Sequence, residues 1–230
     1  TVQLENVSFT YPGNQSPTLQ DVSLKINPGE KLLIIGESGS GKSTMLPVIA
    51  GLYGIQEGSL TFNGMPKGNL EASSLYSMVG DYLHTGQLFR GSVIENITLG
   101  RSEVTFEKVK NTIERLGLQN FIRNSPKGYQ SPLAPEGKGL PRNIIVKLLL
   151  ARSIVHEPAL LVLENPFSEL DQSEKENIID FLMTPSQPWS MVTISTDPYL
   201  AQKCDRILQM QKGRIIRSGT YREMQGLFNQ

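Results

Sequence analysis

One glycine-rich segment constrains the fold of this chain more than any other part of it. The segment reads Gly36-Glu37-Ser38-Gly39-Ser40-Gly41-Lys42-Ser43-Thr44. It fits the pattern G-x-x-x-x-G-K-[S/T], and it lies between an aliphatic run over 31–35 and a helix-like stretch from 42 to about 50. This order of strand, loop and helix is the context that the pattern requires, so the sequence predicts a P-loop fold.

The residue types of this loop suit the binding of phosphate. Glycines let the backbone turn its N–H groups inward around an anion, and the N-terminus of the following helix adds partial positive charge. In this arrangement Lys42 reaches the outer phosphates, and the Ser43 hydroxyl can ligate magnesium. The loop alone leaves kinases, GTPases and motor ATPases open.

Composition excludes several other classes of protein. The 230 residues include 22 Lys plus Arg and 22 Asp plus Glu, so no basic field exists to hold nucleic acid. Cys204 is the single cysteine, and with only His84 and His156 the chain lacks the ligands for a Cys- or His-rich metal centre. We expect a reducing compartment, no membrane span within these residues, and, because Thr1 is not an initiator Met, a domain of a longer protein.

Short strands are predicted by two kinds of pattern. Apolar and polar residues alternate over 3–9, 18–26 and 59–63, which indicates an antiparallel N-terminal region. Continuous apolar runs over 159–163 and 191–195, like the run before the loop, are typical of buried parallel strands.

Helices are predicted between these strands. Helical spacing of apolar residues over 105–122 predicts a helical insert, a Pro- and Gly-rich loop follows over 124–141, and a long helix is expected over 142–156. The expected fold class is α/β: a P-loop NTPase with a mostly parallel core sheet, an N-terminal antiparallel β-subdomain and an inserted α-helical subdomain.

Further landmarks occur in a fixed order along the chain. They are Tyr11, 25 residues before Gly36, and the segments 88–97, 128–137, Ser168-Glu169-Leu170-Asp171 and 205–220. In order and spacing, this set resembles the nucleotide-binding domain of an ATP-binding-cassette (ABC) transporter of the exporter type, over essentially the whole chain.

The resemblance implies a layout and a set of partners. It implies one domain over 1–230, with about 1–83 and 157–230 forming the core and its antiparallel sheet, and about 84–156 forming the helical subdomain. It implies ATP and Mg²⁺ as cofactors, with Tyr11 stacking on adenine. It also implies a second nucleotide-binding domain that meets the loop containing Ser168 and Asp171, a transmembrane domain of the same transporter, and a location on the cytoplasmic face of a membrane.

The strand that in this family ends in Asp and then Glu here ends in Glu164 and Asn165. Glu164 can still hold magnesium, although the added methylene shifts its carboxylate and magnesium tolerates distortion poorly. Asn165 stands where the resemblance puts the glutamate that polarises the attacking water, and an amide cannot accept a proton. Turnover at this site is therefore expected to be slow.

Two other catalytic positions also depart from the family. The switch histidine that contacts the γ-phosphate falls at Thr196, a neutral hydroxyl, and the magnesium-sensing glutamine falls at His84. The signature Leu-Ser-Gly-Gly-Gln aligns with Leu140-Pro141-Arg142-Asn143-Ile144. A proline has no N–H, and two larger side chains occupy positions where close backbone approach to phosphate is required.

Two functions remain open from the sequence. One is the ATP-binding domain of an exporter-type transporter that binds Mg-ATP, couples nucleotide-driven dimerisation to a membrane domain, and hydrolyses ATP weakly or not at all. The other is a nucleotide-responsive pseudo-ATPase, a regulatory or scaffolding module in which binding alone shifts affinity for a partner.

Overall fold

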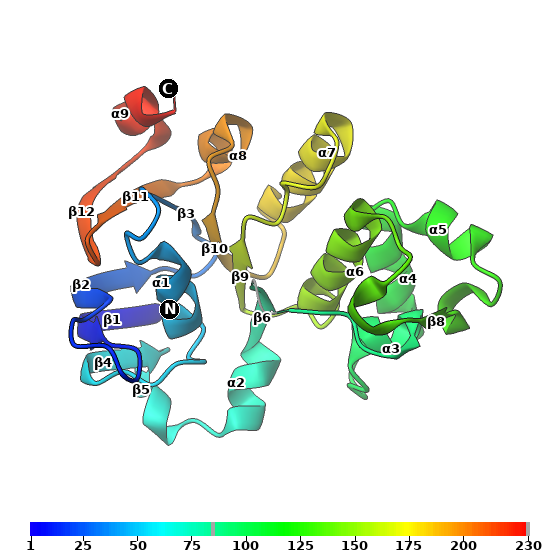
Figure 1. The fold of residues 1–230 in the computed structure, drawn as a ribbon, viewed down its shortest axis with the longest axis horizontal. Helices are drawn as coiled ribbons and strands as arrows, with labels where there is room; N and C mark the ends of the chain where they lie inside the picture. Colours follow the sequence, from blue (N-terminus) through cyan, green and yellow to red (C-terminus); the bar gives the residue numbers. More distant parts are fainter. Residues whose placement is uncertain (84–85, 229–230) are drawn as a thin grey trace.

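The computed structural model describes residues 1–83 and 86–228, and it is built from two large sheets with helices around them (Figure 1). The first sheet has four strands in the order β2-β1-β4-β5, and the second has six in the order β12-β11-β3-β10-β9-β6. A two-stranded pair, β7-β8, lies among the helices.

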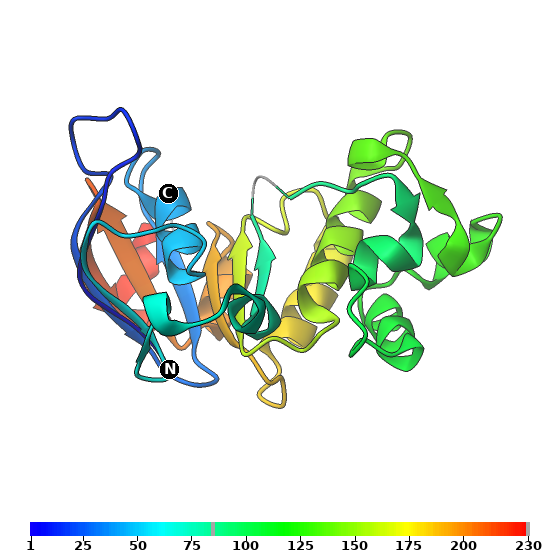
Figure 2. The same cartoon turned by 90° about the horizontal axis from the view of Figure 1, so that it is seen from below.

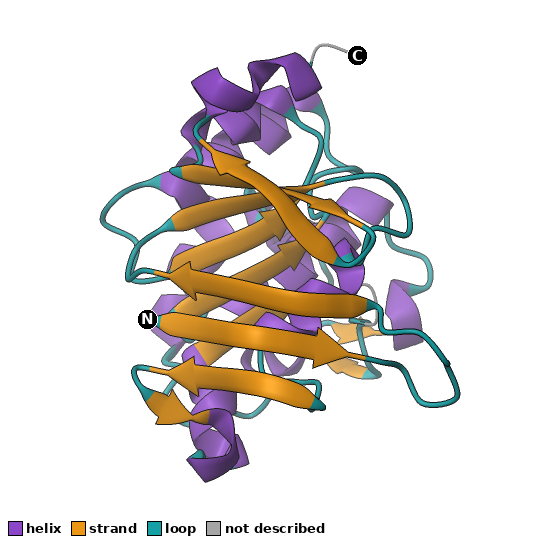
Figure 3. Cartoon of the chain, turned by 90° about the vertical axis from the view of Figure 1, so that its left-hand side faces the viewer, coloured by secondary structure: helices purple, strands orange, loops and turns teal. Residues whose placement is uncertain are grey.

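The four-stranded sheet is antiparallel and comes from the N-terminal part of the chain (Figure 3). Its strands are β1 (Val2–Phe9), β2 (Leu19–Ile26), β4 (Glu57–Phe62) and β5 (Met65–Pro66). Asn63 and Gly64 join β4 to β5 with φ of 50° and 79°, the left-handed pair that a tight hairpin needs. These strands confirm the alternation read in the sequence.

The six-stranded sheet is parallel except for its last strand. It consists of β3 (Lys31–Ile35), β6 (Val79–Tyr82), β9 (Leu160–Glu164), β10 (Ser190–Ile194), β11 (Arg206–Gln211) and β12 (Arg214–Gly219). Strand β3 pairs with β10 on one side and β11 on the other. The expected fold class, a P-loop α/β fold with an additional antiparallel sheet, is confirmed.

Each face of the six-stranded sheet has its own hydrophobic core. Along β3, Leu32 and Ile34 pack with the antiparallel sheet and helix α1 (Lys42–Ile49), whereas Leu33 and Ile35 pack with the helices of the other face. Strands buried on both faces need continuous apolar sequence, which explains the short aliphatic runs.

Helices cover both faces of this sheet and extend beyond its free edge at β6. They are α2 (Ala72–Met78), α3 (Val93–Thr98), α4 (Phe106–Arg115), α5 (Gln119–Asn124), α6 (Arg142–Ile154), α7 (Gln172–Met183), α8 (Pro198–Lys203) and α9 (Tyr221–Met224). In Figure 2, α3 to α5 lie at the opposite end of the molecule from the antiparallel sheet. No helix among the described residues is long and apolar enough to cross a membrane.

Short elements complete the fold. They are β7 (Gly91–Ser92), β8 (Pro132–Leu133) and single 3₁₀ turns at Lys67–Asn69, Gly128–Gln130, Pro135–Gly137 and Gln225–Leu227. The helical insert predicted over 105–122 consists of two helices, α4 and α5. Gly117 takes a φ of 66°, which ends α4 and turns the chain before α5 begins.

Candidate functional site

The carboxyl ends of three neighbouring strands bring the predicted site residues to one edge of the parallel sheet. Ile194 of β10 lies beside Ile34 of β3 and beside Glu164 of β9. The backbone N–H of Asn165 donates to the Ile194 carbonyl at 3.0 Å. The loop that starts at Gly36, the pair Glu164-Asn165 and the segment containing Thr196 therefore lie at the same edge, where ligands bind in open α/β sheets.

The glycines of the 36–44 loop are required by its geometry. Gly36 has a φ of 150°, and a Cβ there would lie 2.3 Å from the Met210 carbonyl oxygen and 2.8 Å from Ser40 Oγ. Gly41, with a φ of 98°, precedes α1 directly, and a Cβ there would lie 3.0 Å from the Thr18 carbonyl oxygen. The backbone of Met210 in β11 lies against Gly36, and the backbone of Thr18, just before β2, lies against Gly41. Only glycine therefore fits at these two positions.

Lys42 lies across the loop. Its Nζ donates to the carbonyl oxygens of Gly36 and Glu37, each at 2.7 Å, and to Ser40 Oγ at 3.3 Å. Burial lowers the pKa of Lys42, and the carboxylate of Glu164 opposes that shift. A cation and an acidic oxygen therefore face the same space, as a site for phosphate and a divalent cation requires.

The remaining loop residues divide into exposed and buried positions. Glu37, Ser38, Gly39 and Ser43 are exposed, and Ser40 and Thr44 are buried. The exposed Ser43 hydroxyl suits metal ligation, whereas Thr44 faces inward.

Tyr11 belongs to a cluster of three aromatic rings beside the loop. Its hydroxyl lies 3.1 Å from Thr44 Oγ1, and its ring packs edge-on against Phe9, with 4.9 Å between centroids. Tyr53 stacks on Phe9 at 5.3 Å and meets Tyr11 at 5.9 Å. The sequence analysis proposed Tyr11 as a site residue and did not name Tyr53, because no local pattern links a residue after α1 to one after β1.

The end of β9 has an unusual backbone. Asn165 is exposed and has a φ of 46°, a left-handed conformation that Asn tolerates better than most other residues. Glu164, half-buried, is the last residue of the strand. The Ser168 hydroxyl donates to the Asn165 carbonyl at 3.4 Å, which brings the loop 168–171 to the same place.

The other predicted catalytic positions are Thr196 and His84. Thr196 is exposed, in the segment between β10 and α8. His84 lies outside the described residues. Asp171 is the N-cap of α7 and accepts a hydrogen bond from the Glu174 N–H at 2.8 Å.

The segment Leu140–Ile144 forms the start of α6. Pro141 is the N-cap residue and provides no side-chain cap. The N–H of Ile144 donates to Asn143 Oδ1 at 3.0 Å and to the Pro141 carbonyl at 3.1 Å, so a donor at the helix N-terminus is used within the chain. Arg142 is exposed. Burial and the carboxylate of Glu169 raise the pKa of Tyr82, and the nearby charge of Arg142 opposes this rise.

Comparison with protein families gives one decisive match. The model of the family described as "ABC transporter" matches residues 19–168, which is more than half of the chain. The chain belongs to the ABC transporter family. The match begins at β2, includes the glycine-rich loop, and ends at Ser168.

Curated relatives of this ABC domain are longer proteins. A putative multidrug export ATP-binding/permease protein of Bacillus subtilis is 30% identical over 97% of this chain and 38% of its own length. An uncharacterized ABC transporter ATP-binding protein of Haemophilus influenzae is 29% identical over 97% of this chain and 40% of its own length. The chain thus spans about two fifths of these relatives.

A solved structure of a bacterial Atm1-family ABC exporter with ATP bound has the same fold. It superposes with a TM-score of 0.90 over 98% of this chain and 39% of its own, at 23% sequence identity. This ABC domain therefore has the fold that the matched part of that exporter has.

Proposed function

We propose that this chain is the ATP-binding domain of an exporter-type ABC transporter that binds Mg-ATP and hydrolyses it slowly or not at all. Binding of Mg-ATP would cause the chain to dimerise with a second nucleotide-binding domain. This dimerisation would be coupled to a conformational change in a membrane domain. Residues 84–156 would act as the helical subdomain and the remainder as the core.

One observation supports the catalytic half of this proposal, namely Asn165 at the end of β9. It follows Glu164 at the sheet edge, on the side where Lys42 and the glycine-rich loop lie. A glutamate at this position would accept a proton from the attacking water, and an amide cannot. Such general-base help is worth about 10²- to 10⁴-fold in rate, or roughly 3 to 5 kcal/mol of barrier.

The residues of the loop suit Mg-ATP. A hydroxyl at Ser43 and the carboxylate of Glu164 are the oxygen ligands that magnesium prefers, with phosphate oxygens completing its coordination. Among residues 1–83 and 86–228, no group of three or more His, Cys, Asp or Glu could hold a metal alone, which fits a cation that arrives with a nucleotide. Bound magnesium would neutralise phosphate charge, while Lys42 and the loop N–H groups would orient the phosphates.

The start of α6 would serve a partner's nucleotide poorly. Pro141 lacks an N–H, and the Ile144 N–H is already bonded to Asn143. Fewer donors are left at this helix end to meet phosphate. This supports weak hydrolysis in a pair of such domains, including a pair with an intact second domain.

The partners are inferred from relatives. The Bacillus subtilis relative is named an export ATP-binding/permease protein, and most of its length lies outside the region matched by this chain. We infer a transmembrane domain of the same transporter as partner, and a position on the cytoplasmic face of a membrane.

The test is steady-state phosphate release from Mg-ATP over a wide range of protein concentration, beside direct nucleotide binding by calorimetry. Lys42→Ala serves as the control for contaminating ATPase and is expected to abolish binding. The proposal expects binding by the natural chain with release at the control level or slightly above it. Release that reaches the level of an intact ABC ATPase and rises with the square of concentration would show an efficiently hydrolysing homodimer and would refute the proposal.

A further inference from the structure

The segment that follows α1 contacts the part of the chain that carries Tyr11. Two of its residues make these contacts, Gln56 through its side-chain amide and Tyr53 through its ring. Both residues lie between α1 and β4, outside any helix or strand. Two segments about forty residues apart in the sequence therefore lie against each other beside the candidate site.

The amide of Gln56 continues the pairing of β1 with β4 beyond its last pair of residues. That last pair is Ser8 with Glu57. Beyond it, the N–H of Thr10 donates to Gln56 Oε1 at 2.9 Å, and Gln56 Nε2 donates to the Thr10 carbonyl at 3.0 Å. One side chain thus satisfies both backbone groups of Thr10, the residue directly before Tyr11.

This support is needed because the chain leaves the sheet at this point. Residues 12–17 are exposed, and the loop closes where the Thr18 N–H donates to the Phe9 carbonyl at 2.7 Å. A side chain at the start of an exposed loop keeps one direction only where the backbone beside it is held. The two hydrogen bonds to Thr10 hold the backbone directly before Tyr11.

Tyr53 supports the ring of Tyr11 from the side. It is stacked on Phe9 with 15° between the ring planes, and it meets Tyr11 at 79°. Burial raises the pKa of Tyr53, and the neighbouring phenol of Tyr11 and the carboxylate of Glu164 add to this rise. Edge contacts of this kind favour one relative orientation of two rings. Tyr53 therefore restricts the directions that the Tyr11 ring can take.

The ring of Tyr11 is placed for contact with a nucleotide. Its hydroxyl lies 3.1 Å from Thr44 Oγ1 in the first turn of α1, directly after the glycine-rich loop. Phe9 and Tyr53 meet the ring at 85° and 79°, so neither lies parallel to its face. A flat nucleobase can stack parallel to such a ring, and this contact contributes most when the ring is already fixed.

We propose that Tyr53 and Gln56 are positioning residues that hold the Tyr11 ring for stacking on the base of a bound nucleotide. Gln56 fixes the backbone beside the ring, and Tyr53 fixes its direction, so less conformational entropy is lost when the base binds. This inference rests on the proposed binding of Mg-ATP. The two positioning residues touch no nucleotide in this account, and they act only through Tyr11.

The test compares two ligands by calorimetry, Mg-ATP and Mg-tripolyphosphate, which has three phosphates and no base. Phosphate contacts contribute to both affinities, so their ratio measures what the nucleoside adds. Gln56→Ala and Tyr53→Leu are each expected to lower the affinity for Mg-ATP by about 3- to 10-fold, the worth of one hydrogen bond or one ring pair. The affinity for Mg-tripolyphosphate should stay unchanged, whereas a general loss of structure would lower both.

Two further variants test whether the effect passes through Tyr11. Tyr53→Phe keeps the ring that stacks on Phe9, and it should retain most of the natural preference for Mg-ATP over Mg-tripolyphosphate. Tyr11→Ala removes the ring itself. In that background Gln56→Ala should lower the affinity for Mg-ATP no further, because the backbone that it supports no longer carries a stacking side chain.

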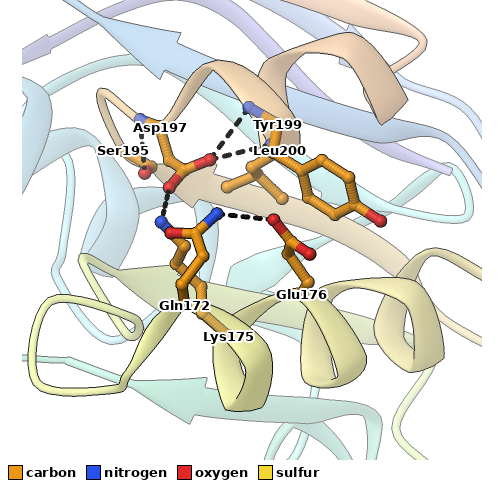
Figure 4. A network of polar contacts seen from close by, with 7 residues as sticks. All are labelled: Gln172, Lys175, Glu176, Ser195, Asp197, Tyr199 and Leu200. Carbon is orange, nitrogen blue, oxygen red and sulfur yellow. Dashed lines mark hydrogen bonds and ion pairs between the residues drawn. The ribbon is translucent and has the colours of Figure 1, made fainter.

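Two control variants remove polar contacts elsewhere in the chain. Gln3→Ala is matched to Gln56→Ala, because Gln3 also belongs to the antiparallel sheet, where its amide donates to Glu5 at 2.7 Å. Lys175→Ala removes an ion pair between α7 and Asp197, the N-cap of α8 (Figure 4). Any effect of this change on phosphate binding would alter both affinities. Both controls should therefore keep the natural ratio.

The outcomes separate this inference from the proposed function. An unchanged ratio in Gln56→Ala and Tyr53→Leu, or an equal fall in affinity for both ligands, would overturn the positioning role. A natural chain that binds Mg-ATP no more tightly than Mg-tripolyphosphate would also overturn it, because the base would then add nothing to binding at the phosphates. A natural chain that binds neither ligand would instead refute the proposed function.

Discussion

Replacing the carboxylate of Glu174 is expected to destabilise the protein far more than removing the charge of Lys147. The two side chains form an ion pair between α7 and α6, but they are buried to different degrees. The Lys147 side chain is 2% exposed, whereas that of Glu174 is 29% exposed. In Glu174→Gln a buried ammonium loses its counter-charge, while in Lys147→Met the remaining carboxylate can still reach water.

The magnitude follows from this difference in exposure. Breaking a buried ion pair by removing one partner costs about 3 to 5 kcal/mol, because the other charge is left uncompensated. Because the Glu174 side of the pair is partly exposed to water, we expect the loss of stability in Glu174→Gln to lie at the lower end of this range, at about 3 kcal/mol. Lys147→Met keeps the side-chain volume and should cost about 1 kcal/mol or less.

Thermal and urea unfolding measure these costs. For a chain of this size, about 3 kcal/mol corresponds to a fall in Tm of roughly 6 to 12 °C. The double variant closes the cycle and should be as stable as Lys147→Met alone, because the amide then faces no buried charge. Equal losses for the two single variants would contradict the reasoning, since they would mean that burial does not decide the cost.

Three further outcomes are expected. Asn165→Glu alone should raise phosphate release little above the Lys42→Ala background. The backbone at position 165 is left-handed, and the start of α6 over 140–144 is unchanged in this variant. Release at the level of an intact ABC ATPase would contradict this expectation. Tyr11→Phe loses the hydroxyl contact with Thr44 but keeps the ring, so its ATP affinity in calorimetry should fall less than that of Tyr11→Ala. Burial lowers the pKa of His156 to about 4, so the neutral form is favoured in the folded state, and stability should fall as pH drops from about 6.5 toward 4. Urea midpoints that fall equally in His156→Gln would argue against that assignment.

The fold could be predicted largely because its strongest signals are local. The run over 31–35 coincides with β3, and the helix predicted from Arg142 is α6, which ends at Ile154 and so is two residues shorter than expected. The helical spacing over 105–122 predicted a helical insert but did not show that it is divided into α4 and α5 at Gly117, whose backbone is left-handed. Periodicity reports which face is buried and does not report where the chain turns.

The sequence could propose site residues only where a motif names them. Loop 36–44 and the end of β9 could be proposed because their spacing along the chain is short and fixed. The ion pair between Lys175 and Asp197 joins residues 22 apart, and its existence depends on how α7 lies against the segment after β10. The sequence contains one signal that could have pointed to Asp197. Asp followed by Pro is a typical helix start, and Asp197 and Pro198 begin α8, with Asp197 as its N-cap.

The position of β3 in its sheet has a consequence for biosynthesis. Both of its neighbours come from the last fifth of the chain, β10 beginning at Ser190 and β11 at Arg206. While the ribosome is still adding those residues, the strand that carries the glycine-rich loop has no partner in its sheet, and its apolar edges are open to wrong pairing. A nascent chain that stops before Ser190 should therefore be a target for chaperones, and the loop should reach its final shape only after β11 has left the exit tunnel.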